Sequence, residues 1–273
     1  MIVYLKSVGI VAPGIANWHE AINVFTQTKQ YFPTPVEKKL ATILPPNERR
    51  RATRVTQLAM YAAQQADTPE QNDSSLNQCL QVFCSSNGDI TTFHQISQAL
   101  AMDGRPVSPT RFHNSVHNAP AGYWSIASQS KTPSTSITAY SDSFSTGLLE
   151  AAVQLNASDN KQHRDCLLVC YDEIPAEPFQ PQIQITAEFA CALRLSLNSD
   201  NALACMNIQI DHQCQPLTAL SDPAIEQLRQ ANPQAVALPL LNAIARQDNK
   251  KILLPYFEQG LEISLSALAA NQE

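Results

Sequence analysis

The sequence lacks any apolar run close to the ~18 consecutive residues that a membrane-spanning helix requires. Residues 1–6 include a lysine and are not followed by the apolar core and small-residue cleavage site of a signal peptide. An excess of positive charge is also missing, since the formal net charge is −6, which argues against binding to a phosphate backbone. We therefore expect a soluble cytoplasmic protein with no membrane span and no nucleic-acid partner.

Patterns typical of metal sites and disulfide scaffolds are missing too. No CxxC pair or histidine cluster completes a zinc set, and the cysteines number seven, an odd count in a chain of this size. Cys166 and Cys170 would share one face of a strand as core residues. His113 and His117 have the i, i+4 spacing of metal ligands, but no adjacent glutamate or third ligand accompanies them. The sequence predicts reduced cysteines, no metal and no cofactor.

The chain is long and apolar enough for one large α/β domain, with 273 residues of which 44% are hydrophobic. Periodicity predicts an alternation of strands and helices, which favours parallel strands covered by helices on both faces. The expected strands are 2–11, 80–85, 134–140, 166–172, 189–197, 204–210 and a strand or hairpin within 252–265. The expected helices are one capped by Asn17, then 48–66, 90–101, two within 108–128, 143–156, and 222–246 broken at Pro233.

Several stretches occur in an order typical of one known family. They are 8–14 (VGIVAPG), 49–51 with 56–59 (RRR, TQLA), 107–109 (VSP), 114–115 (NS), 118–122 (NAPAG), 125–126 (SI), 136–139 (SITA) and 147–152 (GLLEAA). Each match is weak alone, but together they resemble the β-ketoacyl synthase family, which has the condensing-enzyme or thiolase-like fold. The resemblance covers roughly residues 1–200 of a single domain, 1–273. Residues 201–273 then represent a divergent, shortened C-terminal half.

Two departures from the family bear on activity. The family places a nucleophilic cysteine at a strand-to-helix turn, where the helix N-terminus lowers the thiol pKa; counting back from residues 150–152 puts Ser141 there. The family also has two histidines in its C-terminal half, whereas the last histidine here is His212, outside any such motif. Without these groups, decarboxylative condensation has no acyl anchor and no proton-handling residue. The resemblance therefore implies a catalytically silent subunit.

Three classes of function remain open. The first is a chain-length-factor-like subunit that pairs with a full-length synthase in polyketide, aryl polyene or fatty-acyl elongation, the short aryl-polyene factors being the most similar. The second is an acyl-carrier-protein-dependent acyltransferase or thioester hydrolase that uses Ser141 or Ser143, although no G-x-S-x-G motif is present and either serine could simply cap a helix. The third is a homodimeric scaffold.

The resemblance also predicts surfaces for partners. The family segment that meets the dimer partner and closes the acyl tunnel corresponds to residues near 112–126 and the following strand. The resulting candidates are Phe112, Val116, Tyr123, Trp124, Ile126, Ser136, Thr138 and Tyr140. In the family, basic residues at a helix start dock the acidic acyl carrier protein, which makes candidates of Arg49, Arg50, Arg51 and Arg54. A solvated helix start is the alternative interpretation of these arginines.

Overall fold

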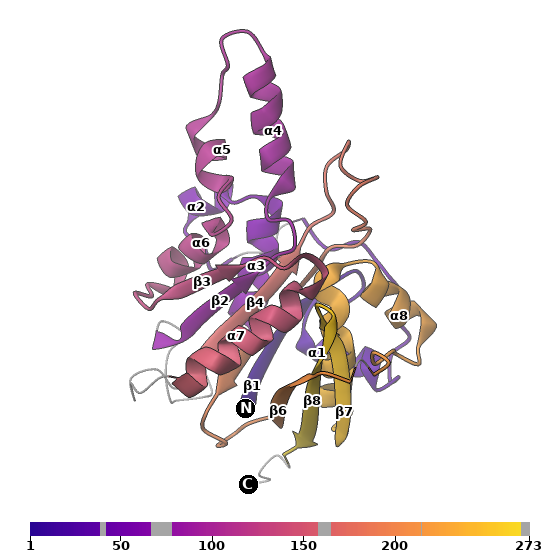
Figure 1. Cartoon of the computed structure of the whole chain (residues 1–273). Coiled ribbons are helices and arrows are strands. Elements are labelled where there is room, and N and C mark those ends of the chain that lie inside the picture. Colours follow the sequence, from indigo (N-terminus) through magenta and orange to yellow (C-terminus); the bar gives the residue numbers. More distant parts are fainter. Residues whose placement is uncertain (39–41, 67–77, 158–164, 214, 269–273) are drawn as a thin grey trace.

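A mixed eight-stranded sheet forms the centre of the molecule (Figure 1). The computed structural model describes residues 1–38, 42–66, 78–157, 165–213 and 215–268. The strands lie in the order β3-β2-β4-β5-β1-β6-β8-β7. Their bounds are β1 Ile2–Val11, β2 Leu80–Cys84, β3 Ser134–Ile137, β4 Asp165–Asp172, β5 Phe189–Ser196, β6 Ala204–Asp211, β7 Lys250–Tyr256 and β8 Gln259–Ala267.

The expectation of parallel strands holds for only part of the sheet. Strands β2, β3 and β4 are parallel, whereas β5, β1, β6, β8 and β7 follow with antiparallel pairing at every step from β4 onward. The reason lies in the connections. A parallel pair needs a crossover such as a helix, whereas β4 to β5 and β7 to β8 are joined without one and can pair directly as neighbours.

The helices agree with the sequence pattern except that one expected helix is split in two, and one expected strand ends early. Their bounds are α1 Trp18–Phe25, α2 Pro46–Arg51, α3 Arg54–Gln65, α4 Ile90–Ala101, α5 Pro109–Asn114, α6 Ala119–Ser128, α7 Ser143–Ala157, α8 Pro223–Gln230 and α9 Leu238–Ala245, with 3₁₀ turns η2 Tyr140–Asp142 and η3 Pro233–Ala237. The single helix expected over 48–66 is two helices, because Ala52 and Thr53 adopt extended backbone conformations. The strand expected to reach residue 140 ends at Ile137, because Tyr140 begins a 3₁₀ turn.

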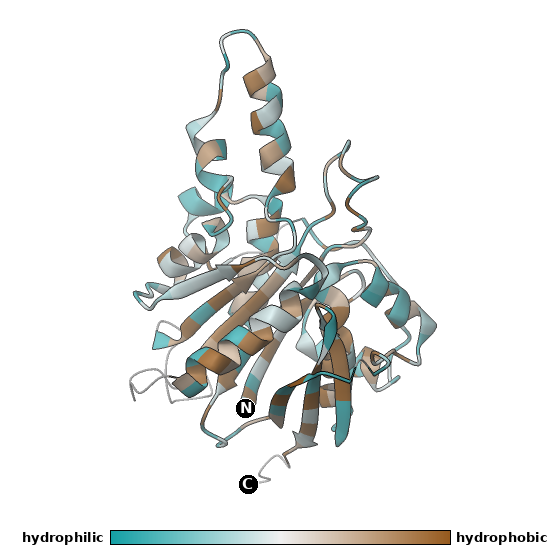
Figure 2. Ribbon diagram, viewed as in Figure 1, coloured by the Kyte–Doolittle hydropathy of each residue, from teal (hydrophilic) through white to brown (hydrophobic). Residues whose placement is uncertain are grey.

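Helices cover both faces of the sheet, as the sequence predicts. Along β4, Cys166, Leu168 and Cys170 belong to the core cluster that includes α7, while Leu167 and Val169 belong to the cluster that includes α3. The two faces of the central strands are thus both apolar, which Figure 2 shows as brown ribbon beneath the helices. The prediction that the two β4 cysteines share a buried face is confirmed. The six cysteines within the described ranges form no disulfide with one another, and Cys214 lies outside those ranges.

The two ends of the sheet differ. At one end β3 is a four-residue edge strand, and β2 is the one strand that pairs with it among the described residues. At the other end β7 is the edge strand, and Thr218 forms two hydrogen bonds with it. The Thr218 amide donates to the Leu253 carbonyl at 2.9 Å, and the Leu253 amide donates to the Thr218 hydroxyl at 2.9 Å. The β7 edge is therefore partly covered.

Helices α4 and α5 project away from the sheet as an arm, with the turn between them at its tip (Figure 1). Asp89 caps α4, its Oδ1 accepting a hydrogen bond from the Thr92 amide at 2.7 Å. In the described part of the chain, no helix is long and apolar enough to cross a membrane.

Candidate functional site at the strand-to-helix turn

The turn between β3 and α7 is the position where the sequence places Ser141. Tyr140 precedes that serine with φ of 50°, in the left-handed region that a bulky side chain rarely adopts. The fully buried Ser143 hydroxyl holds this turn from inside, since it accepts a hydrogen bond from the Ala139 amide at 2.9 Å and donates to the Tyr140 carbonyl at 2.8 Å. Ser143 therefore stabilises the start of α7 and leaves Ser141 as the exposed hydroxyl of the turn.

Ser141 lies beside a carboxylate that the sequence reasoning did not consider. Its Oγ donates to Asp142 Oδ2 at 3.5 Å, a long contact. Burial raises the pKa of Asp142, while hydrogen bonds from the Phe257 amide and from Ser141 oppose that shift. The arrangement is a serine with one acidic neighbour. Phe257 lies 115 residues beyond Asp142, so no spacing in the sequence connects the two residues.

The tip of the β7–β8 hairpin closes this site from the C-terminal region. Phe257 packs edge to face against Tyr256, with ring centroids 5.0 Å apart, and its own backbone has φ of 52°. Phe257 and Tyr140 are both mostly exposed, at 62% and 56%. Two exposed aromatic residues with left-handed backbone thus flank Asp142: Tyr140 lies two positions before it, and the Phe257 amide donates to it. Such backbone conformations cluster at functional sites.

The tunnel and interface candidates separate into exposed and buried residues. Phe112, Val116, Ile126 and Tyr140 have large exposed fractions. Helix α6, which carries Ile126, contacts β3, and Tyr140 begins the 3₁₀ turn that follows that strand. Thr138 is exposed, with its hydroxyl donating to the Ser86 carbonyl at 3.0 Å.

The remaining candidates belong to the interior of the chain. Trp124 has no exposed surface and Tyr123 almost none; both pack in the core cluster that includes α3. The Tyr123 hydroxyl donates to Asn114 Oδ1 at 3.0 Å, which ties α6 to α5. Ser136 has a buried Oγ with no hydrogen-bond partner in the described structure. The placement of Tyr123 and Trp124 on a partner-facing wall therefore does not fit this chain, because helix α6 turns both inward.

The two histidines considered as metal ligands do not share a helical face. His113 lies in α5 and packs edge to face on Tyr123, with centroids 6.1 Å apart, whereas His117 follows the end of α5 and contacts the Ile137 carbonyl through Nε2 at 3.0 Å. The helix ends at Asn114, which breaks the i, i+4 relation. Across the described ranges, no group of three or more His, Cys, Asp and Glu side chains is arranged to hold a metal.

Two of the four arginine candidates are committed to structural contacts. Arg54 makes a paired contact with Glu188, with Nε to Oε1 and Nη2 to Oε2 both 2.6 Å. Arg49 donates through Nη2 to the Thr42 and Leu44 carbonyls, each at 2.8 Å. Pairing of Arg54 with a residue 134 positions away could not be read from sequence.

The other two arginines are exposed. Arg50 bonds to the nearby Asn47 side chain, and Arg51 lies 3.7 Å from Glu48 Oε1 within the same helix. The backbone carbonyl of Arg51 accepts from Asn114 Nδ2 at 2.8 Å, which joins the end of α2 to the end of α5. The exposed cations thus sit at the foot of the arm.

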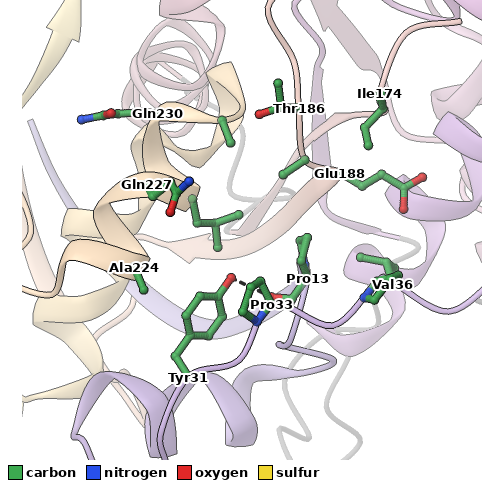
Figure 3. Close-up of a pocket in the computed structure, with 14 residues that line it drawn as sticks. Pro13, Tyr31, Pro33, Val36, Ile174, Thr186, Glu188, Ala224, Gln227 and Gln230 are labelled. Atoms are coloured by element: carbon green, nitrogen blue, oxygen red, sulfur yellow. Dashed lines mark hydrogen bonds between the residues drawn. The ribbon is translucent and has the colours of Figure 1, made fainter.

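A separate cleft of about 550 Å³ opens between the β1–α1 turn, the segment 31–36, the β4–β5 loop and α8 (Figure 3). Its walls are mainly apolar and include three prolines, at 13, 33 and 35. The Tyr31 hydroxyl donates to the Pro13 carbonyl at 2.9 Å, and burial raises its pKa to about 12. Glu188 lines the cleft while its charge is paired with Arg54.

Comparison with known proteins now gives the family. Residues 18–255 match the family model for the N-terminal domain of β-ketoacyl synthases. No curated protein sequence matches the chain. A chain in the complex of the ketosynthase ApeO with its chain length factor ApeC from Xenorhabdus doucetiae is similar, with TM-score 0.71 and 24% identity, covering 97% of this chain and 99% of that one.

Two further solved structures have the same fold at lower identity. The ishigamide ketosynthase/chain length factor gives a TM-score of 0.70 at 13% identity, covering 97% of this chain and 99% of that one. A β-ketoacyl synthase from Burkholderia phymatum gives 0.60 at 14% identity, covering 85% of this chain and 70% of that one. The chain described here therefore has the thiolase-like fold, as predicted, and it belongs to the β-ketoacyl synthase family.

Proposed function

We propose that the chain is a non-catalytic, chain-length-factor-like subunit that pairs with an active β-ketoacyl synthase and shapes its acyl tunnel. The observation that carries the proposal is that the turn between β3 and α7 holds Ser141 and no cysteine. The family resemblance assigns the nucleophilic cysteine of a synthase to such a turn, because the helix N-terminus lowers its pKa. A serine hydroxyl needs a strong general base, and the carboxylate of Asp142, 3.5 Å away, is a weak one. The likeness in fold, over 97% of this chain, to a chain from a complex of a ketosynthase with its chain length factor supports the proposal.

The surface near the β3 edge supports a partner there. Phe112, Val116, Ile126 and Tyr140 leave apolar side chains in solvent, on the stretch of chain from α5 to the turn after β3. A patch of this kind favours association with another protein, and a free edge strand can pair with another strand. We propose that the synthase covers this surface, and that its acyl carrier protein uses Arg50 and Arg51 at the foot of the arm.

Co-expression with a full-length synthase of the same elongation system tests the proposal. We expect the two chains to co-elute in size exclusion, and the synthase to lose its normal product length when this subunit is omitted. A monomer or homodimer that never co-elutes with the synthase would contradict the proposal and favour the homodimeric scaffold.

The alternative, an acyltransferase or thioester hydrolase, is favoured by the contact between Ser141 and Asp142. Incubation with acyl carrier protein bearing an acyl thioester, followed by intact mass spectrometry, separates the two functions. We expect no covalent adduct on this chain, and we expect Ser141→Ala to leave condensation by the complex unchanged. An acyl adduct that disappears in Ser141→Ala would establish the alternative; loss of condensation on replacing the synthase cysteine is the positive control.

A further inference from the structure

The loop between β4 and β5, residues 173–188, folds over the base of α4. It carries prolines at 175, 178 and 181 and makes turns within itself, with the Phe179 amide donating to the Ala176 carbonyl at 3.0 Å and the Ile183 amide donating to the Phe179 carbonyl at 2.8 Å. Its contact with α4 is an aromatic one: the Phe179 ring meets the His94 ring edge to face, with centroids 5.5 Å apart. We call residues 173–188 the proline loop.

A buried carboxyl group lies at the root of the proline loop. Glu173 is only 7% exposed, it takes a hydrogen bond from the Thr91 side chain, and its Oε1 has no partner in the described structure. The first turn of α4 presents a second carboxyl group to it: Asp89 caps the helix through Oδ1, while its buried Oδ2 is also without a partner. The helix and the loop that pack together here thus each contribute a carboxyl group with a buried, unused oxygen, and the charge of Asp89 acts on Glu173.

The other charged groups around Glu173 give little compensation. Glu188, at the far end of the loop, adds a further negative charge, and Arg54 is already held by Glu188 at 2.6 Å. The adjacent Asp172 is fully engaged with Ser85, Ser86 and Gln234. Burial, and after it the charge of Asp89, raises the pKa of Glu173 to about 7, with Glu188 raising it further and Thr91 and Arg54 opposing.

We propose that the proline loop is a proton-controlled strap, which the neutral acid form of Glu173 holds against α4 and which ionisation of Glu173 releases. The neutral acid removes one of two facing charges and supplies a hydrogen-bond donor where the two carboxyl groups otherwise offer only acceptors. The proposal stands apart from the pairing with a synthase, since it concerns a contact within this chain.

The sign of the pH dependence follows from the two states. In the closed loop the pKa of Glu173 is about 7, and its ordinary value, expected when the loop is open to water, is 4.5. Between pH 4.5 and pH 7 the closed state therefore binds one proton more than the open state. The closed state is most favoured below pH 4.5, loses stability as pH rises towards 7, and changes little above pH 7. The two pKa values correspond to a change on the order of 100-fold in the closing equilibrium.

Release of the strap would change the cleft of Figure 3. Ile174, just after Glu173, lines that cleft, and so do Thr186, Ala187 and Glu188 at the end of the loop. Because both ends of the loop form cleft walls, its movement alters the width of the cleft. The strap thus couples solution pH to access at this cleft.

Hydrogen exchange of the full chain, measured by mass spectrometry from pH 5 to pH 8, tests the strap. We compare wild type with Glu173→Gln and with the matched control Glu177→Gln, which removes an exposed carboxyl group from the same loop. Comparison at each pH cancels the intrinsic effect of pH on exchange. We expect wild type and Glu177→Gln to lose protection of 173–188 on the order of 10- to 100-fold as pH rises, and Glu173→Gln to stay protected throughout.

Equal pH profiles for wild type and Glu173→Gln would overturn the proposal. His94 is the other titratable group at this contact, and a pH dependence that persists in Glu173→Gln but disappears in His94→Gln would transfer the effect to it. If Glu173→Gln does not fold, Asp89→Asn decides the question, since asparagine also caps helices. Asp89→Asn should move the loss of protection to lower pH, and an unchanged profile in that variant would contradict the strap.

Discussion

Phe112 and Trp124 share one predicted role, but their surroundings differ. Truncating each to alanine should therefore change the free energy of unfolding by very different amounts. Trp124 is fully buried between α3 and the sheet, and Phe112 is 65% exposed on α5. Large aromatic truncations in a core cost about 3–5 kcal/mol. Exposed truncations usually stay within about 0.5 kcal/mol. Trp124→Ala should therefore destabilise the chain severely, and Phe112→Ala should leave its free energy of unfolding nearly unchanged.

Among correctly folded molecules, Phe112→Ala should impair synthase binding and product length more than Trp124→Ala does. If the synthase covers Phe112, removing the ring loses an interface anchor, which costs about 1–2 kcal/mol or roughly 5- to 30-fold in affinity. If the ring also closes the tunnel, the complex with Phe112→Ala should make longer products while the first condensation proceeds. Urea unfolding gives the stabilities, and a reconstituted extension reaction with products sized by mass spectrometry gives the lengths.

Val153→Ala serves as the matched control, since Val153 is an exposed apolar residue on α7. It should change neither stability nor product length. The reasoning fails if Trp124→Ala unfolds at the same urea concentration as wild type. The role of Phe112 fails if an assembled complex carrying Phe112→Ala keeps both its affinity and its product lengths.

Two further predictions concern charge and close packing. Replacing Arg50 and Arg51 by glutamate should weaken binding of the acidic acyl carrier protein more at low salt than at high salt, because salt screens exposed charges. Binding titrations at two ionic strengths measure this. An unchanged affinity at low salt would support the alternative, that both arginines belong to a solvated helix start. Gly147→Ala should lower the unfolding free energy by about 1–3 kcal/mol, since a Cβ there would lie 2.2 Å from Cys84 Sγ. Thermal unfolding measures this. A midpoint equal to that of wild type would show that β2 and α7 move apart at no cost to make room for the methyl group.

The sequence predicted most elements because their signals are local. The cap at Asn17, the apolar spacing of α7 and the run in β4 each depend on neighbours within a few residues, and all three elements are present. The antiparallel placement of β1 between β5 and β6 was not predicted, because it depends on pairings between distant segments. Register of that kind has no local signature.

The candidate site shows the same division. The position of Ser141 followed from counting along one helix, and the helix begins where expected. The contact of Asp142 with the Phe257 amide and the pairing of Arg54 with Glu188 join segments more than 100 residues apart, so no spacing in the sequence could reveal them. The inward direction of Tyr123 and Trp124 was also missed, because a short helix rich in small and apolar residues offers no clear polar face.

The two edge strands of the sheet, β3 and β7, differ in how readily each can pair with a strand of another chain. Thr218 occupies backbone groups of Leu253 on the β7 edge, and Lys250 and Lys251 add charge to that strand, features that oppose further pairing. Within the described residues the β3 edge has one strand neighbour, β2. Pairing with a further strand is therefore favoured at the β3 edge and opposed at the β7 edge.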